Sequence, residues 1–411
     1  MESAPDILSD PQGCTANPSR ESVGELTVEP ETDTLPGRSE QEAELPPYGK
    51  VVFVLPGLIA GGSERIVSGL ANHWASIGGD VSIVTFEPPG TEPYYPIDKR
   101  VKLVQLDVRA APKPRVISAW QVARRIRALR SALKQIRPDV VVSFLTKINV
   151  VSITAAAGLG IPVIVSERNN PEAQRFNAVW DWARTKAYPH AFGLVTMTEG
   201  ARRFFPLYMR KRSWVIPNPV RLPGEWSPQR GNNNLIAVGR LVDQKGFDLL
   251  LEAFSKVARS FPDWTLTIWG EGPLRSELEA RRDELGLGER VRMPGVTERP
   301  TIWIETADIF VLSSRYEGWG IVLLEAMAAG LPVVSFNCEW GPSDMVTDGV
   351  DGLLVPPLDV DALADALAKL MGDKTLRVRL AQSAARSAAK FAPDRINELW
   401  REAVQTAIDG N

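Results

Sequence analysis

One stretch, residues 313–334, constrains the fold more than any other part of the chain. It reads SSRYEGWGIVLLEAMAAGLPVV and follows a short apolar run of the kind found in buried parallel strands. Residues 321–329 are dense in good helix formers, and Gly330 and Pro332 end the helix before Val333 begins another strand. The stretch therefore predicts a strand, a loop, a helix and a second strand, in which the loop leads into a helix N-terminus.

Two carboxylates bracket this loop and helix. They are Glu317 and Glu325, with seven residues between them. A helix N-terminus offers unpaired N–H groups and a partial positive charge, which suit a phosphate, and carboxylates accept hydrogen bonds from hydroxyl groups. The arrangement indicates a ligand that carries both phosphates and sugar hydroxyls, although an ordinary helix with a surface glutamate at each end is the plainer alternative.

The same string supports a resemblance to a known family. The run EGWG with LLEAMAAGLPVV after it resembles the E-x7-E region of retaining glycosyltransferases of family 4, which have the GT-B fold. The resemblance implies an α/β protein with two Rossmann-like domains, whose parallel sheets face each other across a cleft. It also implies transfer of a sugar from a nucleotide-diphosphate sugar with retention of the anomeric configuration.

The length and the alternation of elements agree with two domains. A chain of 411 residues is too long for one core, and its strands alternate with helices as in parallel α/β sheets. We expect an acceptor-side domain at residues 49–222, a nucleotide-sugar-binding domain at 223–392, and a last helix at 393–411 that crosses back to the first domain.

Residues 1–48 differ in composition from the rest of the chain. They hold 11 Asp and Glu against Arg20 and Arg38, a net charge of −9; since the whole chain carries −3, the remainder carries +6. They also contain few large apolar residues and cannot bury enough surface to fold. We predict a disordered acidic tail, which serves as a partner-binding arm or, more simply, as a solubilising extension.

Cysteine and histidine are scarce. Cys14 and Cys338 cannot form a disulfide framework, and with His73 and His190 as the two histidines a metal site of these residue types is not expected. The start of the chain does not resemble a signal peptide, and glycines and a proline divide the uncharged residues 148–166 into a helix and a strand. These features predict a cytoplasmic protein without a membrane span.

Two loops of the first domain are candidate sites. Gly61 and Gly62 follow the first strand and resemble the family's N-terminal glycine pair, where backbone without Cβ lets a phosphate or sugar approach; a tight turn for packing is the alternative. Glu167, Arg168 and Asn169 follow a later apolar strand and are candidates for acceptor binding, although side-chain hydrogen bonds within a turn would also explain them. Many relatives carry a histidine in this region.

The second domain carries the remaining donor-site motifs. The run from Gly239 to Gly246 resembles the family's G-R-x4-K-G element, and its Arg240 and Lys245 suit a diphosphate. The resemblance assigns stabilisation of the leaving diphosphate to Arg240 and Lys245, contact with the donor sugar to Glu317, and the ribose hydroxyls to Glu325. The other donor-binding residues that it implies are Gly239, Gly270, Glu271, Gly295, Val296, Gly318, Trp319, Gly320 and Ile321.

A basic amphipathic helix is predicted at residues 116–136. No acidic residue lies between Asp107 and Asp139, and Arg127, Arg130 and Lys134 line one stripe of the helix. Such a helix can lie on an anionic membrane or bind a pyrophosphate, and a solvated helix face is the alternative. Together with the GGSER run at 61–65, it resembles bacterial transferases that extend undecaprenyl-diphosphate-linked oligosaccharides.

These features favour a metal-independent hexosyl- or N-acetylhexosaminyltransferase without a cofactor. We expect a UDP-sugar as donor, with a GDP-sugar as second choice, and a polyprenyl-diphosphate-linked glycan as acceptor at the inner membrane face. No nucleic-acid partner is expected. The alternatives are a GT-B epimerase or phosphorylase and a non-catalytic nucleotide-sugar-binding protein.

Overall fold

A computed structural model describes most of the chain after residue 48. The described residues are 49–59, 61–108, 119–170, 172, 176–222, 228–297 and 301–410. The predicted acidic tail at residues 1–48 lies outside these ranges. So does the segment 109–118, which includes the first residues of the predicted basic helix.

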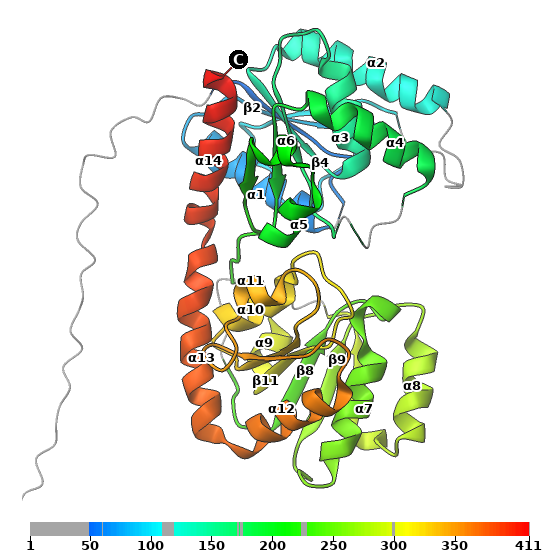
Figure 1. Cartoon of the computed structure of the whole chain (residues 1–411), viewed down its shortest axis with the longest axis vertical. Coiled ribbons are helices and arrows are strands. Elements are labelled where there is room, and N and C mark those ends of the chain that lie inside the picture. Colours follow the sequence, from blue (N-terminus) through cyan, green and yellow to red (C-terminus); the bar gives the residue numbers. More distant parts are fainter. Residues whose placement is uncertain are drawn as a thin grey trace, which may run out of the picture. The chain divides into compact units, whose positions relative to one another are not determined.

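Seven parallel strands form the first sheet, in the order β3-β2-β1-β4-β5-β6-β7 (Figure 1). The strands are β1 (Val51–Val54), β2 (Val81–Thr85), β3 (Lys102–Gln105), β4 (Val140–Phe144), β5 (Val163–Ser166), β6 (Gly193–Thr196) and β7 (Ser213–Val215). The order reverses between β1 and β4. In open α/β sheets ligands bind at such a reversal, beyond the carboxyl ends of the strands.

Helices cover both faces of this sheet. They are α1 (Gly62–Ser76), α2 (Ala119–Ile136), α3 (Thr146–Ala156), α4 (Ala178–Ala187), α5 (Glu199–Phe204) and α6 (Leu207–Arg210), with a 3-10 turn η1 at Tyr188–His190. Because side chains alternate along a strand, Phe53 packs with Trp74 of α1, whereas Val52 and Val54 pack in a different cluster with Leu129 of α2. Burial on both faces explains why these strands read as continuous apolar runs.

The second sheet has six parallel strands in the order β10-β9-β8-β11-β12-β13. They are β8 (Asn234–Val238), β9 (Thr265–Trp269), β10 (Val291–Gly295), β11 (Ile309–Leu312), β12 (Val333–Phe336) and β13 (Leu353–Val355). Here the order reverses between β8 and β11. The loops that follow these two strands contain the G-R-x4-K-G element and Glu317, so the topology places both motifs at one switch point.

The remaining helices belong to this half of the chain and to its C-terminus. They are α7 (Phe247–Ala258), α8 (Arg275–Glu284), α9 (Ile302–Thr306), α10 (Ile321–Ala328), α11 (Pro342–Met345), α12 (Val360–Gly372), α13 (Lys374–Ala388) and α14 (Pro393–Asp409), with 3-10 turns η2 (Asp243–Lys245), η3 (Gly288–Arg290) and η4 (Ala389–Phe391). Although α14 comes last, its Trp400 is fully buried in the core of the first sheet, against Phe144 of β4.

Two separate parallel sheets with helices packed on them confirm the predicted α/β class. The central unit is also as predicted, since β11, α10 and β12 span the strand, helix and strand expected around residues 313–334. Among the helices that the structure describes, none is both long and apolar enough to cross a bilayer.

Candidate active site

Glu317 lies in the loop after β11, where its carboxylate accepts two side-chain hydrogen bonds. Its Oε1 accepts a hydrogen bond from Nζ of Lys245 over 2.6 Å and another from Oγ of Ser314 over 2.6 Å. The Glu317 side chain is only 6% exposed and that of Lys245 15%, so the ion pair is largely shielded from water. A carboxylate and an ammonium are thus fixed side by side at the reversal of the second sheet.

Glycine backbone shapes the approach to this pair. Gly270, which follows β9, has φ +141°, and a Cβ built on it would lie 1.9 Å from the carbonyl oxygen of Gly239. Gly320 precedes α10 with φ +85°, a left-handed conformation that glycine adopts without strain. A side chain at Gly270 would therefore force the loops after β8 and β9 apart, whereas at Gly320 it is the backbone conformation that favours glycine.

Arg240 stands beside these loops with its side chain free. It is exposed, and its guanidinium makes no hydrogen bond or ion pair with any residue of the described ranges. A planar guanidinium can bind a phosphate through two parallel hydrogen bonds. Arg240 is therefore available for an anionic ligand, while Lys245 is already paired with Glu317.

Glu325 is paired with a residue of the other half of the chain. Nη1 of Arg65, in the first turn of α1, lies 2.8 Å from its Oε1, although 260 residues separate them in the sequence. The Glu325 side chain is 16% exposed, and burial raises the pKa of its carboxyl, while the charge and hydrogen bond of Arg65 oppose that rise. The sequence analysis did not predict the contact between Arg65 and Glu325. The position of Arg65, one turn after Gly61 and Gly62, was the feature of the sequence that could have pointed to it.

Gly61 and Gly62 lie at the start of α1. Gly61 is the N-cap residue, with an extended backbone, and Gly62 is the first helical residue, with no atom within 4 Å of where a Cβ would stand. The pair follows β1, at the reversal of the first sheet. Gly62 therefore leaves open space in the turn that holds Arg65, whereas a Cβ on Gly61 would lie 2.2 Å from Oε2 of Glu64.

Two of the predicted acceptor-binding residues are buried and directed inward. Glu167 is 2% exposed, and its carboxylate accepts hydrogen bonds from Thr146, Asn149 and Tyr188. Burial raises the pKa of Glu167, against the lowering effect of these hydrogen bonds. The prediction that Glu167 contacts an acceptor is corrected here, because its carboxylate is enclosed by its own domain.

Arg168 is buried in the same way. Its Nη1 donates to the carbonyl oxygen of Ile216 over 2.9 Å and to Oδ1 of Asn218 over 3.1 Å, and its guanidinium lies over the rings of Phe144 and Trp400. Burial lowers its pKa to about 9. Arg168 thus connects the loop after β5 to the segment after β7, while its Nε and Nη2 have no hydrogen-bond partner among the described residues. Its contact with an acceptor stays a prediction.

Asn169 is exposed, unlike its two neighbours. A Cβ built on Gly318 would lie 3.3 Å from its Cα and 3.3 Å from the carbonyl oxygen of Arg168. The loop after β5 therefore comes close to the loop that holds Glu317. Of the three candidates after β5, Asn169 alone has its side chain in solvent.

The other predicted donor-site residues differ in their exposure. The N–H of Gly270 donates to the carbonyl oxygen of Gly295. Val296, which follows Gly295 in the chain, is 74% exposed. Glu271 pairs with Arg275, the first residue of α8, which lowers the pKa of the Glu271 carboxyl. Ile321 is half-buried at the first position of α10.

Trp319 does not have the exposure that packing on a donor requires. Its side chain is 4% exposed and lies edge-on to the ring of Phe391, in the core beneath α10. Burial of the ring argues against a donor contact through the Trp319 side chain, although the sequence placed Trp319 among the donor-binding residues.

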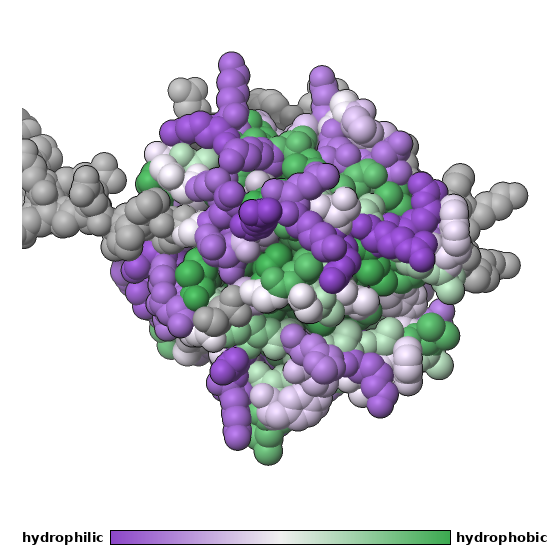
Figure 2. Space-filling view, turned by 90° about the horizontal axis from the view of Figure 1, so that it is seen from above, coloured by the Kyte–Doolittle hydropathy of each residue, from purple (hydrophilic) through white to green (hydrophobic). Residues whose placement is uncertain are grey.

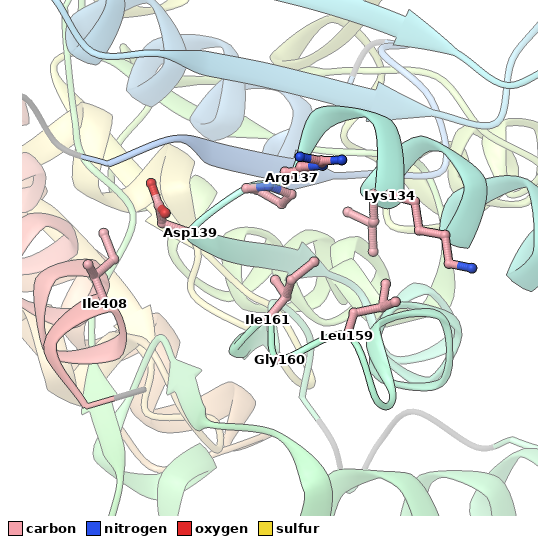
Figure 3. A pocket seen from close by; sticks show the side chains of 9 residues that line it. Lys134, Arg137, Asp139, Leu159, Gly160, Ile161 and Ile408 are labelled. Carbon is pink, nitrogen blue, oxygen red and sulfur yellow. The ribbon is translucent and has the colours of Figure 1, made fainter.

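The three predicted cations of α2 have different surroundings. Arg130 donates from Nη1 to the carbonyl oxygens of Ala155 and Ala157 and so caps the end of α3, whereas Arg127 and Lys134 are exposed. Lys134 and Arg137 line a pocket of about 600 Å³ with Asp139 and Ile161 (Figure 3). These residues precede β4 and β5, so the pocket lies at the edge of the sheet opposite to Gly61 and Asn169.

Comparisons with known proteins agree with this geometry. Residues 61–219 match the family described as Glycosyl transferase 4-like domain, and residues 223–387 match Glycosyl transferases group 1. The structure is similar to that of HepE of Anabaena in complex with UDP, with a TM-score of 0.70 and 20% identity over 87% of this chain and all of that one. Two parallel α/β sheets of this kind define the GT-B class of fold.

Two curated relatives are similar in sequence. The chain is 30% identical over 359 residues to the N-acetylgalactosaminyltransferase of Campylobacter jejuni that acts on an undecaprenol-diphosphate-linked GalNAc-GalNAc-diNAcBac, covering 85% of this chain and 97% of that protein. It is 28% identical to an exopolysaccharide phosphotransferase of Streptomyces coelicolor over 86% of this chain, which spans 40% of that protein's length. The chain belongs to the GT-B glycosyltransferases.

Proposed function

We propose that this protein is a retaining glycosyltransferase that moves a sugar from a nucleotide-diphosphate sugar to a glycan hydroxyl. The observation that carries the proposal is that each carboxylate of the E-x7-E pair is held by a cation: Glu317 by Lys245 and Glu325 by Arg65. A donor brings a diphosphate for Lys245 and the exposed Arg240, and hydroxyls for the two carboxylates. The N-terminus of α10 adds unpaired N–H groups between the two carboxylates.

The reaction breaks the bond between the sugar's anomeric carbon and the diphosphate oxygen. Negative charge then accumulates on the diphosphate, where Arg240, Lys245 and the start of α10 stabilise it. The acceptor hydroxyl forms the new bond on the same face of the sugar and passes its proton to the departing phosphate oxygen. Glu317 holds a hydroxyl of the donor sugar, and Glu325 holds the ribose.

The donor that we favour is a UDP-sugar. The structure of HepE with bound UDP supports this choice, as does the C. jejuni relative, which transfers an N-acetylhexosamine. A thermal-shift screen of UDP-, GDP- and ADP-sugars tests the donor class, because a ligand that binds only the folded state raises the melting temperature. We expect the largest shift with a UDP-sugar; no shift with any of the three classes would contradict the proposal.

The acceptor that we propose is a polyprenyl-diphosphate-linked oligosaccharide, and the protein would work on the inner face of the cytoplasmic membrane. The undecaprenol-linked acceptor of the C. jejuni relative supports this. The exposed cations Arg127 and Lys134 on α2 support it too, together with Trp120, which is 61% exposed and has the guanidinium of Arg124 4.9 Å from its ring centroid. Basic and tryptophan side chains on one helix suit the headgroup region of an anionic membrane.

Figure 2 shows one face of the molecule, on which hydrophilic side chains are prominent and hydrophobic ones lie between them. We do not assign Arg130 to the membrane contact, because its guanidinium donates to carbonyl oxygens at the end of α3. The membrane contact is therefore assigned to Trp120, Arg124, Arg127 and Lys134.

Liposome flotation tests this assignment. The double variant Arg127→Glu/Lys134→Glu should lose flotation with anionic vesicles, and wild type should float less at high salt. A matched control is Arg259→Glu/Lys374→Glu, which reverses two exposed cations of the second half of the chain. Equal flotation of both double variants would show that α2 is not the membrane contact.

A further inference from the structure

The two ion pairs of the site each join a carboxylate to a cation, but they differ in the sheets from which their residues come. Lys245 and Glu317 both come from the second sheet, from the loops after β8 and β11. Arg65 instead comes from α1 of the first sheet and reaches Glu325 on α10. The proposed function gives Lys245 a place on the diphosphate, but it leaves the role of Arg65 open.

The Arg65 guanidinium has capacity for a further partner. Its Nη1 donates to Glu325 over 2.8 Å, and its Nη2 reaches the carbonyl oxygen of Arg221 only at 3.4 Å. A guanidinium has five N–H donors, and the Arg65 side chain is 46% exposed. Open space at Gly62, in the same turn of α1, lets a ligand approach it.

We propose that Arg65 is a second diphosphate-binding cation, and that the donor exchanges the Arg65–Glu325 ion pair for two contacts of its own. The diphosphate takes the guanidinium, and the ribose hydroxyls take the carboxylate. The inference rests on the proposed function and adds that residues of both sheets bind the diphosphate. Without a donor, the ion pair keeps each group charged and oriented.

The surroundings of Glu325 support an exchange. Its side chain is 16% exposed, with Nη1 of Arg65 2.8 Å from its Oε1. Burial raises the pKa of this carboxyl, and the charge and hydrogen bond of Arg65 oppose that rise. A ligand that withdrew Arg65 and gave nothing back would leave a buried charge unpaired. A nucleotide-diphosphate sugar supplies hydroxyl donors to Glu325 in the same step, so neither group loses its partners.

The test compares a nucleoside diphosphate with its nucleoside. Calorimetric titration of the full chain with UDP and with uridine gives both affinities for wild type, Arg65→Gln and Arg65→Lys. A charge-assisted hydrogen bond to phosphate is worth about 1.5–3 kcal/mol, which corresponds to a loss of about tenfold to a hundredfold in UDP affinity for Arg65→Gln. Uridine affinity should stay within about twofold, because uridine has no phosphate.

Two variants separate this role from a structural one. Arg65→Lys keeps the charge but not the planar fork, so its UDP affinity should lie between those of wild type and Arg65→Gln. Arg259→Gln, at an exposed position after α7, should bind both ligands like wild type. If the melting curve shows that Arg65→Gln does not fold, Arg65→Lys replaces it in the test. The inference then requires that Arg65→Lys bind UDP more weakly than wild type and bind uridine as wild type does.

The outcomes distinguish the inference from the proposed function. If wild type binds UDP and the Arg65 variants bind it equally well, the inference is wrong and the proposed function stands. If UDP and uridine weaken by the same factor, Arg65 acts only through Glu325 and the inference is again wrong. If wild type binds none of UDP, GDP and ADP, the proposed function fails and the inference fails with it.

Discussion

The ammonium of Lys245 donates to Oε1 of Glu317 over 2.6 Å, although the two residues stand 72 positions apart in the chain. The contact forms because β8 and β11 are neighbours in the second sheet and the loops after them meet. It joins the G-R-x4-K-G element to the E-x7-E region, which the sequence presents as separate motifs.

Replacing Lys245 should affect turnover strongly. Lys245→Ala removes a cation from the developing diphosphate charge and leaves the Glu317 carboxylate buried without its partner. We expect kcat to fall about a hundredfold or more, with a smaller loss for Lys245→Arg, which keeps the charge. Steady-state kinetics with the preferred donor measure this; kcat within threefold of wild type in Lys245→Ala would remove Lys245 from the mechanism.

Turnover should not depend on a divalent metal ion. Arg240 and Lys245 supply the positive charge that a metal supplies in other phosphoryl and glycosyl transfers. Activity measured after dialysis against EDTA should stay within about twofold of the untreated enzyme. Complete loss of activity that Mg²⁺ or Mn²⁺ restores would count against this use of the two cations.

Glu167 should make stability depend on pH in a defined direction. Because burial raises its pKa above the ordinary value of 4.5, the folded state keeps the proton at pH values where the unfolded chain has released it. The stabilisation is complete below 4.5 and is lost as the pH rises through the folded pKa. Relative to Glu167→Gln, wild type should therefore lose free energy of unfolding as the pH rises above 4.5.

Urea unfolding at several pH values measures this difference. The Gln side chain suits the site sterically, and the Thr146 hydroxyl can turn to accept from its amide. Glu289→Gln, at an exposed position, is the control and should follow the wild-type curve. A gap between wild type and Glu167→Gln that stays constant with pH would contradict the assignment.

Gly270 should tolerate no side chain. Its φ of +141° and the 1.9 Å between an added Cβ and the Gly239 carbonyl oxygen force the loops after β8 and β9 apart. We expect Gly270→Ala to lower the free energy of unfolding by about 1–3 kcal/mol and to weaken donor binding. Gly69→Ala is the matched control, because Gly69 lies inside α1 with open space around it and alanine should be neutral or stabilising there by up to about 1 kcal/mol.

Local structure was readable from the sequence where one pattern determined it. The apolar run before Ser313, the helix formers after Gly320 and the break at Gly330 predicted β11, α10 and β12 within a few residues. The strand–helix alternation likewise predicted the α/β class. These features depend on neighbouring residues and on burial of whole strands, which a sequence shows directly.

Side-chain direction was much less readable. The residues after β5 form a polar run, which is typical of an exposed site loop, but Glu167 turns to Tyr188 and Arg168 turns to Trp400. Their partners lie 18 or more residues away, and Trp400 belongs to a helix at the far end of the chain. The same limit hid the contact between Arg65 and Glu325, since only the folded chain brings α1 to α10.

The most direct test of the account measures release of nucleoside diphosphate from a nucleotide-diphosphate sugar by the purified protein. Wild type should release UDP from at least one UDP-sugar, faster when a polyprenyl-diphosphate-linked glycan is added, and Lys245→Ala with the same melting temperature should release it at least about a hundredfold more slowly. The account is contradicted if wild type releases no nucleoside diphosphate from UDP-, GDP- or ADP-sugars with such an acceptor present, or if Lys245→Ala releases it at the wild-type rate.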